Sequence, residues 1–325
     1  MRKAMNSLYK LVDIGANLGH PSFQPDFADV LNRAKKAGIV KLLITGASES
    51  ITDEAAKLAS KEPDFLYYTA GVHPHDAKDF DDGRTLDFLR SHLTTNSQCV
   101  AVGECGLDFN RNFSPRDQQL RVFEAQVQLA CELGKPLFVH EREAHQEMVA
   151  ILSRHSKSLP PTVIHCFTGT EMEAKQYMDM GLYIGLTGFL WKDRAVDGVK
   201  HALRQRTIRM DRLLLETDAP YMYPNLEDKK LRKDIDIRQR ISTEALALHK
   251  HSDFKRNEPS SLAAICELVA AFMDCPAHEL ANATTANAQR VFGLELEDNH
   301  HQQQQQGQQQ CNDNENENDE SSMVN

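Results

Sequence analysis

The sequence predicts a (β/α)8 TIM barrel, an α/β fold in which eight parallel strands are surrounded by helices. Three observations support this prediction. Short apolar runs alternate with amphipathic stretches over most of the 325 residues, and there are eight such runs. The runs are almost continuously apolar, as expected of parallel strands that are buried on both faces. Eight strand–helix units are the number that closes a barrel.

The eight expected strands follow one another at spacings that leave room for a helix between most of them. They cover residues 9–14, 41–45, 67–72, 100–103, 136–139, 162–164, 182–186 and 213–215. Among the intervening segments, residues 115–135 and 170–181 have helical periodicity, and the second ends at a glycine where a helix C-cap is expected. An open doubly wound sheet is the alternative, but no G-x-G-x-x-G follows the first strand, which disfavours dinucleotide binding.

Two domains of unequal character are expected. Residues 1–294 would form the barrel, whereas residues 295–325 form an acidic tail rich in Gln and Asn with almost nothing to bury. Such a composition predicts disorder. The tail holds eight acidic residues and neither Lys nor Arg, so that −8 of the net charge of −10 belongs to the tail and only −2 to the barrel. The overall acidity therefore does not argue against a barrel that binds an anion.

The cellular environment can also be inferred from the sequence. Seven cysteines are scattered, without a Cys-x-x-Cys pair, which indicates free thiols in a reducing compartment. No apolar stretch approaches the about 18 residues of a membrane span, and the N-terminus lacks the apolar core of a secretory signal. We expect a cytoplasmic protein with a nuclear pool as an option, not a secreted one, and a monomer without membrane contact.

Polar residues gather where the predicted strands end, and in a barrel these ends share one mouth, where active sites lie. The side chains at these positions are those of Asp13, Asn17, Thr45, His73, His75, Glu104, His140, His165, Thr187, Glu216 and Asp218. A single histidine at a strand end is usually structural. Several histidines and carboxylates on one rim instead predict a divalent metal site.

The residue types indicate the chemistry of that site. Glu104, directly after the strand "VAVG", could bridge two cations, with His140, His165 and Asp218 completing the ligand set. Mixed nitrogen and oxygen ligands suit Mg²⁺, Mn²⁺ or Zn²⁺. One ion, or two about 3.5–4 Å apart, would activate water and stabilise a phosphoryl group. We therefore predict Glu104 and Asp218 as catalytic residues, with Asp218 orienting or deprotonating the water.

Several long stretches resemble the TatD-type metal-dependent deoxyribonucleases, which are amidohydrolase-like TIM barrels. They occur in order as "DIGANL", "LLITG", "AGVHPHD", "VAVGECGLDFNRNFSP", "HCFTGT", "YIGLTG", "LLLETDAPY", "KRNEPSSL" and "ATTANAQRVFGL", and they span residues 9–294. The resemblance implies Mg²⁺-dependent 3′-to-5′ exonuclease action on DNA, mainly single-stranded, and on RNA as a second substrate. It also implies a role in DNA repair or degradation.

The resemblance carries the metal-ligand roles onto Glu104, His140, His165 and Asp218 of this chain. Many relatives begin the first strand with an aspartate followed by His-x-His, but here the stretch reads Asp13-Ile14-Gly15-Ala16-Asn17 and both imidazoles are lost. A second ion would then be weakly held, or held by Asp13, Asn17 and water only. 

The resemblance also points to phosphate contacts. They are expected from His73, Arg142 of "HERE" and Arg111, and an arginine suits a phosphate because its guanidinium can bind bidentately. Under this assignment His73 contacts substrate and is not a metal ligand.

Other residues allow two interpretations. Cys105 could be a nucleophile, although a small packed residue is favoured. Asp108 could belong to the outer shell of the site or hold Arg111. Trp191, beside Lys192 and Arg194, could stack on a base or be buried against a helix. 

The segment 257–259 is predicted to be architectural, closing the mouth beside Asp218, with Ser260 or Ser261 capping the helix that follows.

Two other functions compete with a nuclease. A small-molecule amidohydrolase would cleave a C–N bond with the same barrel and ligands, but such enzymes often use a carboxylated lysine in the fourth strand, where this chain has Glu104. A noncatalytic binding protein would not need the complete set of strand-end ligands. Fold alone does not decide between these functions.

Overall fold

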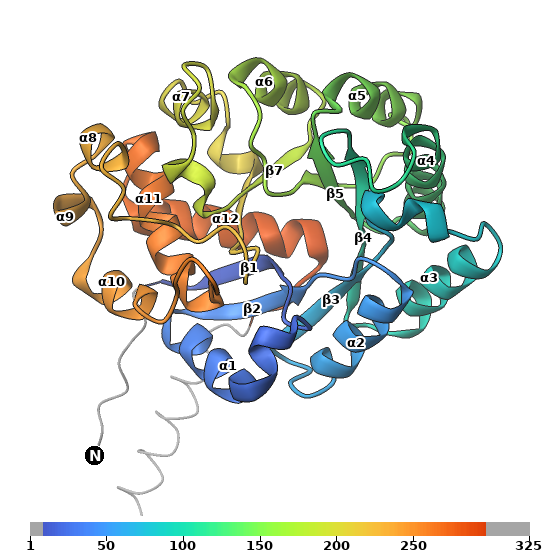
Figure 1. The fold of residues 1–325 in the computed structure, drawn as a ribbon, viewed down its shortest axis with the longest axis horizontal. Helices are drawn as coiled ribbons and strands as arrows, with labels where there is room; N and C mark the ends of the chain where they lie inside the picture. Colours follow the sequence, from blue (N-terminus) through green and yellow to red (C-terminus); the bar gives the residue numbers. More distant parts are fainter. Residues whose placement is uncertain (1–8, 297–325) are drawn as a thin grey trace, which may run out of the picture. The chain divides into compact units, whose positions relative to one another are not determined.

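The computed structural model describes residues 9–296, and these form the predicted (β/α)8 barrel (Figure 1). Eight strands lie in one parallel sheet in chain order. They are β1 (Leu11–Ala16), β2 (Ile39–Ile44), β3 (Leu66–Ala70), β4 (Cys99–Asp108), β5 (Leu137–Arg142), β6 (Thr162–Ile164), β7 (Tyr183–Leu186) and β8 (Leu213–Leu215).

The sheet closes at its last junction through the backbone that follows β8. The amide of Asp218 donates to the Gly15 carbonyl at 2.8 Å, and the amide of Asn17 donates to the Ala219 carbonyl at 2.6 Å. These two bonds join the end of β8 to the end of β1. The open doubly wound sheet is therefore excluded.

Helices surround the sheet and account for the alternating pattern of the sequence (Figure 1). The helices that follow β1 to β7 are α1 (Phe27–Lys36), α2 (Glu49–Ala59), α3 (Arg84–Thr95), α4 (Arg116–Leu133), α5 (His145–Arg154), α6 (Glu171–Asp179) and α7 (Val199–Arg204). After β8 come α8 (Leu231–Asp234), α9 (Ile237–Arg240), α10 (Thr243–His249), α11 (Leu262–Met273) and α12 (Ala277–Phe292). Five short 3-10 helices complete the set: η1 (Pro21–Asp26), η2 (Pro74–Asp79), η3 (Gly188–Trp191), η4 (Met210–Arg212) and η5 (Pro259–Ser261).

Local sequence explains where individual helices begin and end. Helix α6 starts with a capping box, in which the Thr170 hydroxyl accepts from the Glu173 amide and the Glu173 carboxylate accepts from the Thr170 amide. Helix α4 ends at Gly134, which adopts the left-handed conformation that the C-cap requires. The glycine predicted to end the 170–181 helix, Gly181, likewise has a positive φ of 77°.

Strands β4 and β5 run further than the sequence indicated. The expected ends at residues 103 and 139 are wrong, because β4 continues to Asp108 and β5 to Arg142, pairing Gly106 with His140. The continuation requires Gly106 at a φ of 143°, where an added Cβ would lie 1.9 Å from the His140 carbonyl oxygen. Glu104 is therefore inside a strand, not after one.

The interior of the barrel divides into an apolar end and a polar end. Near the N-terminal ends of their strands, Val12, Val100 and Tyr183 are buried in one cluster with Val291 and its neighbours in α12. Helix α12 thus covers this end of the barrel. The opposite end, where the strands finish, is left to polar side chains.

The segment between β8 and α11 is fastened by buried charges. Glu258 is fully buried and forms ion pairs with Arg33 of α1, at 2.7 Å, and with Arg256, at 2.6 Å. Arg256 also pairs with Asp26 at 2.7 Å. The segment is consequently held against the first βα unit at the mouth.

The predicted architectural role of residues 257–259 agrees with their contacts. The Asn257 side chain donates to the Thr217 carbonyl, next to Asp218. The predicted cap is wrong in detail, since α11 has no side-chain cap and the Ser261 hydroxyl donates to Asn257 Oδ1 and the Glu258 carbonyl.

The acidic tail lies beyond the described residues except for 295 and 296, and its disorder stays a prediction. Within residues 9–296 no single helix is long and apolar enough to cross a membrane. Pro259–Met273 and Ala277–Phe292 satisfy that criterion only as a pair bent by 110°, and most of their apolar side chains are buried in the core.

Candidate metal centre and active site

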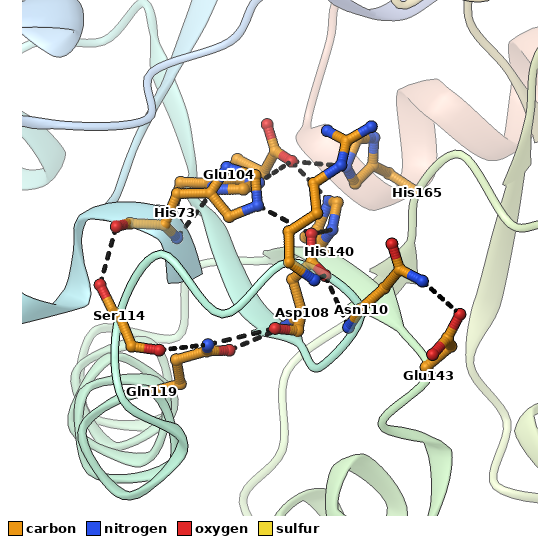
Figure 2. Close-up of polar contacts among 11 residues, drawn as sticks. His73, Glu104, Asp108, Asn110, Ser114, Gln119, His140, Glu143 and His165 are labelled. Carbon is orange, nitrogen blue, oxygen red and sulfur yellow. Dashed lines mark hydrogen bonds and ion pairs between the residues drawn. The ribbon is translucent and has the colours of Figure 1, made fainter.

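The centre of the candidate site is the Glu104 carboxylate, which meets three imidazoles from three other strands or loops (Figure 2). Its Oε1 lies 3.2 Å from His73 Nε2, 3.0 Å from His140 Nδ1 and 2.9 Å from His165 Nε2. The sequence prediction brought Glu104, His140 and His165 together correctly. His73, which was assigned to phosphate, lies in this cluster as well.

Asp108 extends the cluster on the β4 side. Its Oδ2 lies 2.8 Å from His75 Nε2 and 3.5 Å from His140 Nε2. Its Oδ1 accepts from the backbone amides of Asn110 and Arg111, at 3.1 and 2.8 Å. Asp108 therefore both fixes the loop after β4 and contacts the site histidines, and its bond to Arg111 goes to the backbone and not to the guanidinium.

A second buried carboxylate, that of Glu216, orients the His165 ring. Glu216 is fully buried, and its Oε2 lies 3.3 Å from His165 Nδ1 while its Oε1 accepts from the Cys166 amide. Glycines on two neighbouring strands make room for it, because a Cβ at Gly15 or Gly185 would lie 2.5 or 2.6 Å from its carboxylate oxygens. With Nδ1 facing Glu216, Nε2 of His165 is directed to Glu104.

Asp218 lies near the cluster but makes a separate contact. Its Oδ1 accepts from the Asn17 side-chain amide at 2.9 Å. Burial is the main cause that raises the pKa of Asp218 to about 7, and the Glu104 and Glu216 charges add to it, against the lowering effect of His165. The backbone of Asp218 is in the left-handed region, with a φ of 49°.

The Asp13 carboxylate of β1 is bonded within the barrel and is not exposed at the mouth. Both of its oxygens are satisfied by Thr217, from the hydroxyl at 2.6 Å and the amide at 3.0 Å. Burial raises the pKa of Asp13 to about 7. In this arrangement Asp13 and Asn17 bind the residues that follow β8, and the second-ion site suggested for them stays a prediction.

The charges of the cluster favour a bound cation. Burial would raise the pKa of Glu104, but His165 and His73 outweigh it and hold the pKa well below its usual range. Burial would lower the pKa of His165, but Glu104 and Glu216 raise it well above its ordinary value. The carboxylate is thus anionic, and the carboxylates around His140 and His165 raise the pKa of both imidazoles against burial, whereas burial lowers the pKa of His73. A divalent cation can take the place of the protons on His140 and His165.

The donor set fits such a cation on two grounds. Ligand atoms of His73, Glu104 and His140 all lie within 4.8 Å of one another, which makes this trio a candidate metal-binding group. In addition, the buried His140 Nε2 makes no hydrogen bond of ordinary geometry among the described residues and has only Asp108 Oδ2 as an ion-pair contact, at 3.5 Å, although a buried polar atom normally has a closer partner. Two imidazoles and a carboxylate are ligands that Mg²⁺, Mn²⁺ or Zn²⁺ accepts.

The predicted phosphate-binding arginines lie at the rim. Arg111 is exposed in the loop after β4, and Arg142 is partly exposed at the end of β5, where its carbonyl accepts from the Phe109 amide. Neither guanidinium has an ion pair with any residue in 9–296, and both are therefore free for an anion.

Two open alternatives can now be decided. Cys105 is fully buried, and burial raises the pKa of its thiol far above its ordinary value, so it is a packed residue and not a nucleophile. Trp191 is partly buried, with its indole N–H donating to the Tyr223 carbonyl at 2.7 Å, and the more exposed ring beside it is that of Phe254. The burial interpretation of Trp191 therefore holds.

Some residues of the site had no role in the sequence prediction. His75 and Glu216 were recognised only as strand-end residues, although one contacts Asp108 and the other His165. The signal that could have singled them out was their spacing, because each is two residues from an assigned site residue.

Comparisons with known proteins agree with this geometry. A family model described as TatD-related DNase matches residues 12–293. A protein of Erwinia tasmaniensis named 3′-5′ ssDNA/RNA exonuclease TatD is 41% identical over 284 residues, which are 87% of this chain and 100% of that protein. 

Solved structures are similar as well. The crystal structure of a TatD homologue from Escherichia coli has a TM-score of 0.74 and 26% identity, covering 88% of this chain and 98% of that one. A TatD-family hydrolase from Entamoeba histolytica has a TM-score of 0.75 and 25% identity, covering 88% and 99%.

Proposed function

Because this chain belongs to the TatD-related DNase family, we propose that it is a metal-dependent 3′-to-5′ exonuclease that hydrolyses phosphodiester bonds of single-stranded DNA and also of RNA. The observation that carries the proposal is the buried Glu104 carboxylate, surrounded by three imidazoles at the barrel mouth. The 41% identity to a relative named as an ssDNA/RNA exonuclease supports the substrate class.

The metal would be held by Glu104, His73 and His140, with His165 beside them. A bound divalent ion supplies Lewis-acid stabilisation of the phosphoryl oxygens and acidifies water. We propose Mg²⁺ as the physiological ion, with Mn²⁺ and Zn²⁺ as alternatives, and one strongly held ion or two. This assignment makes His73 a ligand and not only a substrate contact.

The chain's own residues bind the substrate and move the proton. Arg111 and Arg142, without ion pairs to residues in 9–296, bind the phosphates next to the scissile bond. The Asp218 carboxylate accepts the proton of the attacking water at its oxygen, and Asn17 holds that carboxylate in place. Glu216 fixes the His165 ring so that the imidazole keeps its orientation throughout.

The remaining features are proposals that rest on sequence. We propose a monomer without membrane contact that acts in DNA repair or DNA degradation, in the cytoplasm and in a nuclear pool. The six cysteines of the described residues are all free thiols, which supports a reducing compartment. A C–N-cleaving amidohydrolase has no specific observation in its favour.

A 5′-labelled single-stranded oligodeoxynucleotide tests this proposal, incubated with Mg²⁺, with and without EDTA. We expect a ladder that shortens from the 3′ end and disappears with EDTA or with Glu104→Gln. The matched control is Glu143→Gln, the same substitution at an exposed rim residue outside the cluster, which should retain activity. An intact oligonucleotide in Mg²⁺, Mn²⁺ and Zn²⁺ would contradict the proposal and favour C–N hydrolysis.

A further inference from the structure

The large apolar side chains that face water are gathered at one end of the barrel. Within residues 9–296, five of the six lie between a strand and the next helix or in the first turn of that helix, and therefore at the mouth. The sixth, Phe254, lies between α10 and η5, with its ring against Trp191 and Tyr223 in the loops after β7 and β8. The six are Ile51, Phe113, Met172, Val196, Tyr221 and Phe254, with 43%, 60%, 79%, 93%, 54% and 66% of their surface exposed. A protein gains nothing in stability from such exposure, so its restriction to the active-site face indicates a ligand with apolar parts.

Phe113 stands directly against the histidines of the site. It lies in the loop between β4 and α4, and its ring meets the His75 ring edge-on, with centroids 4.7 Å apart and planes at 85°. His75 in turn contacts Asp108 and the His73 ring, whose centroid is 4.2 Å away. The Phe113 ring thus contacts the metal-binding cluster through one side chain, that of His75, and is still mostly open to water.

Tyr221 lies on another wall of the barrel, in the segment that follows β8. Its amide donates to the Asp218 carbonyl at 2.9 Å, and its ring meets the edge of the His20 ring at 6.1 Å between centroids.

The two rings belong to opposite walls of the barrel because of the strand order. Phe113 follows β4 and Tyr221 follows β8, and in a barrel of eight strands in chain order these are opposite walls. Glu104 comes from β4, and its imidazoles come from the loop after β3, from β5 and from the end of β6. A chain whose phosphate rests on the metal would therefore place its neighbouring groups against one ring or the other.

We propose that Phe113 and Tyr221 are base-stacking residues, which hold the nucleobases on the two sides of the scissile phosphate. This inference rests on the proposed nuclease function and specifies how the same site recognises its substrate. Stacking on exposed rings is how proteins bind single strands without regard to sequence, since every base has a π-face. Arg111, exposed two residues before Phe113, adds the cation that the adjacent phosphate requires.

This arrangement also explains a preference for single strands. In a duplex the faces of the bases are covered by their neighbours, and a ring can reach them only after unstacking. A single-stranded 3′ end offers its terminal base freely. The two rings therefore select for substrate form and not for base identity.

The test uses 5′-labelled oligodeoxynucleotides that carry a tetrahydrofuran abasic residue at the 3′-terminal or the penultimate position, compared with the fully base-bearing strand. In the wild-type protein, removal of either base should lower kcat/KM for the first cleavage by about 5- to 100-fold, the range of one base–aromatic stack. Phe113→Ala and Tyr221→Ala should each produce a similar loss on the base-bearing strand. Each should lose little further activity when the base that stacks on that ring is already absent.

Two controls separate stacking from structural damage. Tyr221→Phe and Phe113→Tyr keep an aromatic ring and should retain the preference for base-bearing substrate. Arg90→Ala, which removes a side chain that pairs with Glu132 on the outer surface of α3, away from the mouth, should leave kcat/KM within about twofold of wild type.

The outcomes distinguish this inference from the proposed function. If the wild-type protein degrades base-bearing and abasic ends at equal rates, the enzyme is a nuclease but the rings do not bind bases. The same conclusion follows if the alanine variants lose activity equally on both substrates. If no strand is degraded at all, it is the nuclease function that fails.

Discussion

Replacing Gly106 by alanine should damage the site through the backbone of β4. A Cβ at this position would lie 1.9 Å from the His140 carbonyl oxygen, although carbon and oxygen atoms normally approach no closer than about 3.3 Å. The strands must separate by more than an ångström locally, and His140 moves with its carbonyl. Both Glu104 and His140 belong to the strands that separate, so the metal-binding cluster should be distorted.

The loss in the free energy of unfolding caused by Gly106→Ala has two contributions. A non-glycine residue at a φ of 143° is strained by about 1–3 kcal/mol. Overpacking a tightly filled position adds about 1–3 kcal/mol. We therefore expect Gly106→Ala to lower the free energy of unfolding by about 2–6 kcal/mol and to weaken metal binding.

Gly134→Ala is the matched control. Gly134 also has a positive φ, of 62°, but an added Cβ there has no neighbour within 4 Å. Its cost should be the conformational strain alone, about 1–2 kcal/mol, without any effect on metal affinity. The assay is urea unfolding of both variants in EDTA, followed by calorimetric titration with Mn²⁺. Equal destabilisation of the two variants, or unchanged Mn²⁺ affinity in Gly106→Ala, would refute this reasoning.

Three further outcomes can be checked with the same purified protein. Arg256→Ala leaves the buried Glu258 with one of its two arginines and should lower the free energy of unfolding in urea by about 2–3 kcal/mol. Arg240→Ala removes an exposed ion pair and should lower it by less than about 1 kcal/mol. Similar losses in the two variants would contradict the role of the buried network. Arg256 and Arg33 lower the pKa of Asp26 from 3.8 to about 2, so the stability advantage of wild type over Asp26→Asn should be full above pH 4 and disappear as the pH falls to 2; an advantage that does not change over this range would refute the assignment. Cys105 should resist alkylation at pH 8 in the native protein and react only after unfolding, as read by peptide mass spectrometry, and rapid native labelling would contradict its packed position.

The barrel could be predicted from sequence because apolar runs are a direct consequence of burial on both faces. The extension of β4 could not, since Gly103, Glu104 and Gly106 look like the end of a strand to any rule based on propensity. These residues nevertheless belong to β4, because its pairing with β5 needs glycine where the two backbones approach and because a metal site accepts a carboxylate inside the barrel. The end of β4 is therefore decided by its pairing with β5 and not by the strand propensity of its residues.

The site was predictable as a set of residues but not in the role of each one. Strand order alone brings Glu104, His140 and His165 to one mouth. Whether Asp13 points into that mouth or binds Thr217 depends on register and rotamer, which sequence does not specify. His73 was likewise assignable to the rim, but its 3.2 Å approach to Glu104 is a property of the folded loop after β3.

The central claim is that Glu104 is the core of a catalytic metal centre, and anomalous diffraction from crystals soaked in Mn²⁺ tests it most directly. We predict an anomalous peak within coordination distance of Glu104, with His73 and His140 as further ligands, and its loss in Glu104→Gln crystals of unchanged fold. A well-ordered mouth without such a peak, or a peak bound elsewhere that survives the substitution, would contradict the account.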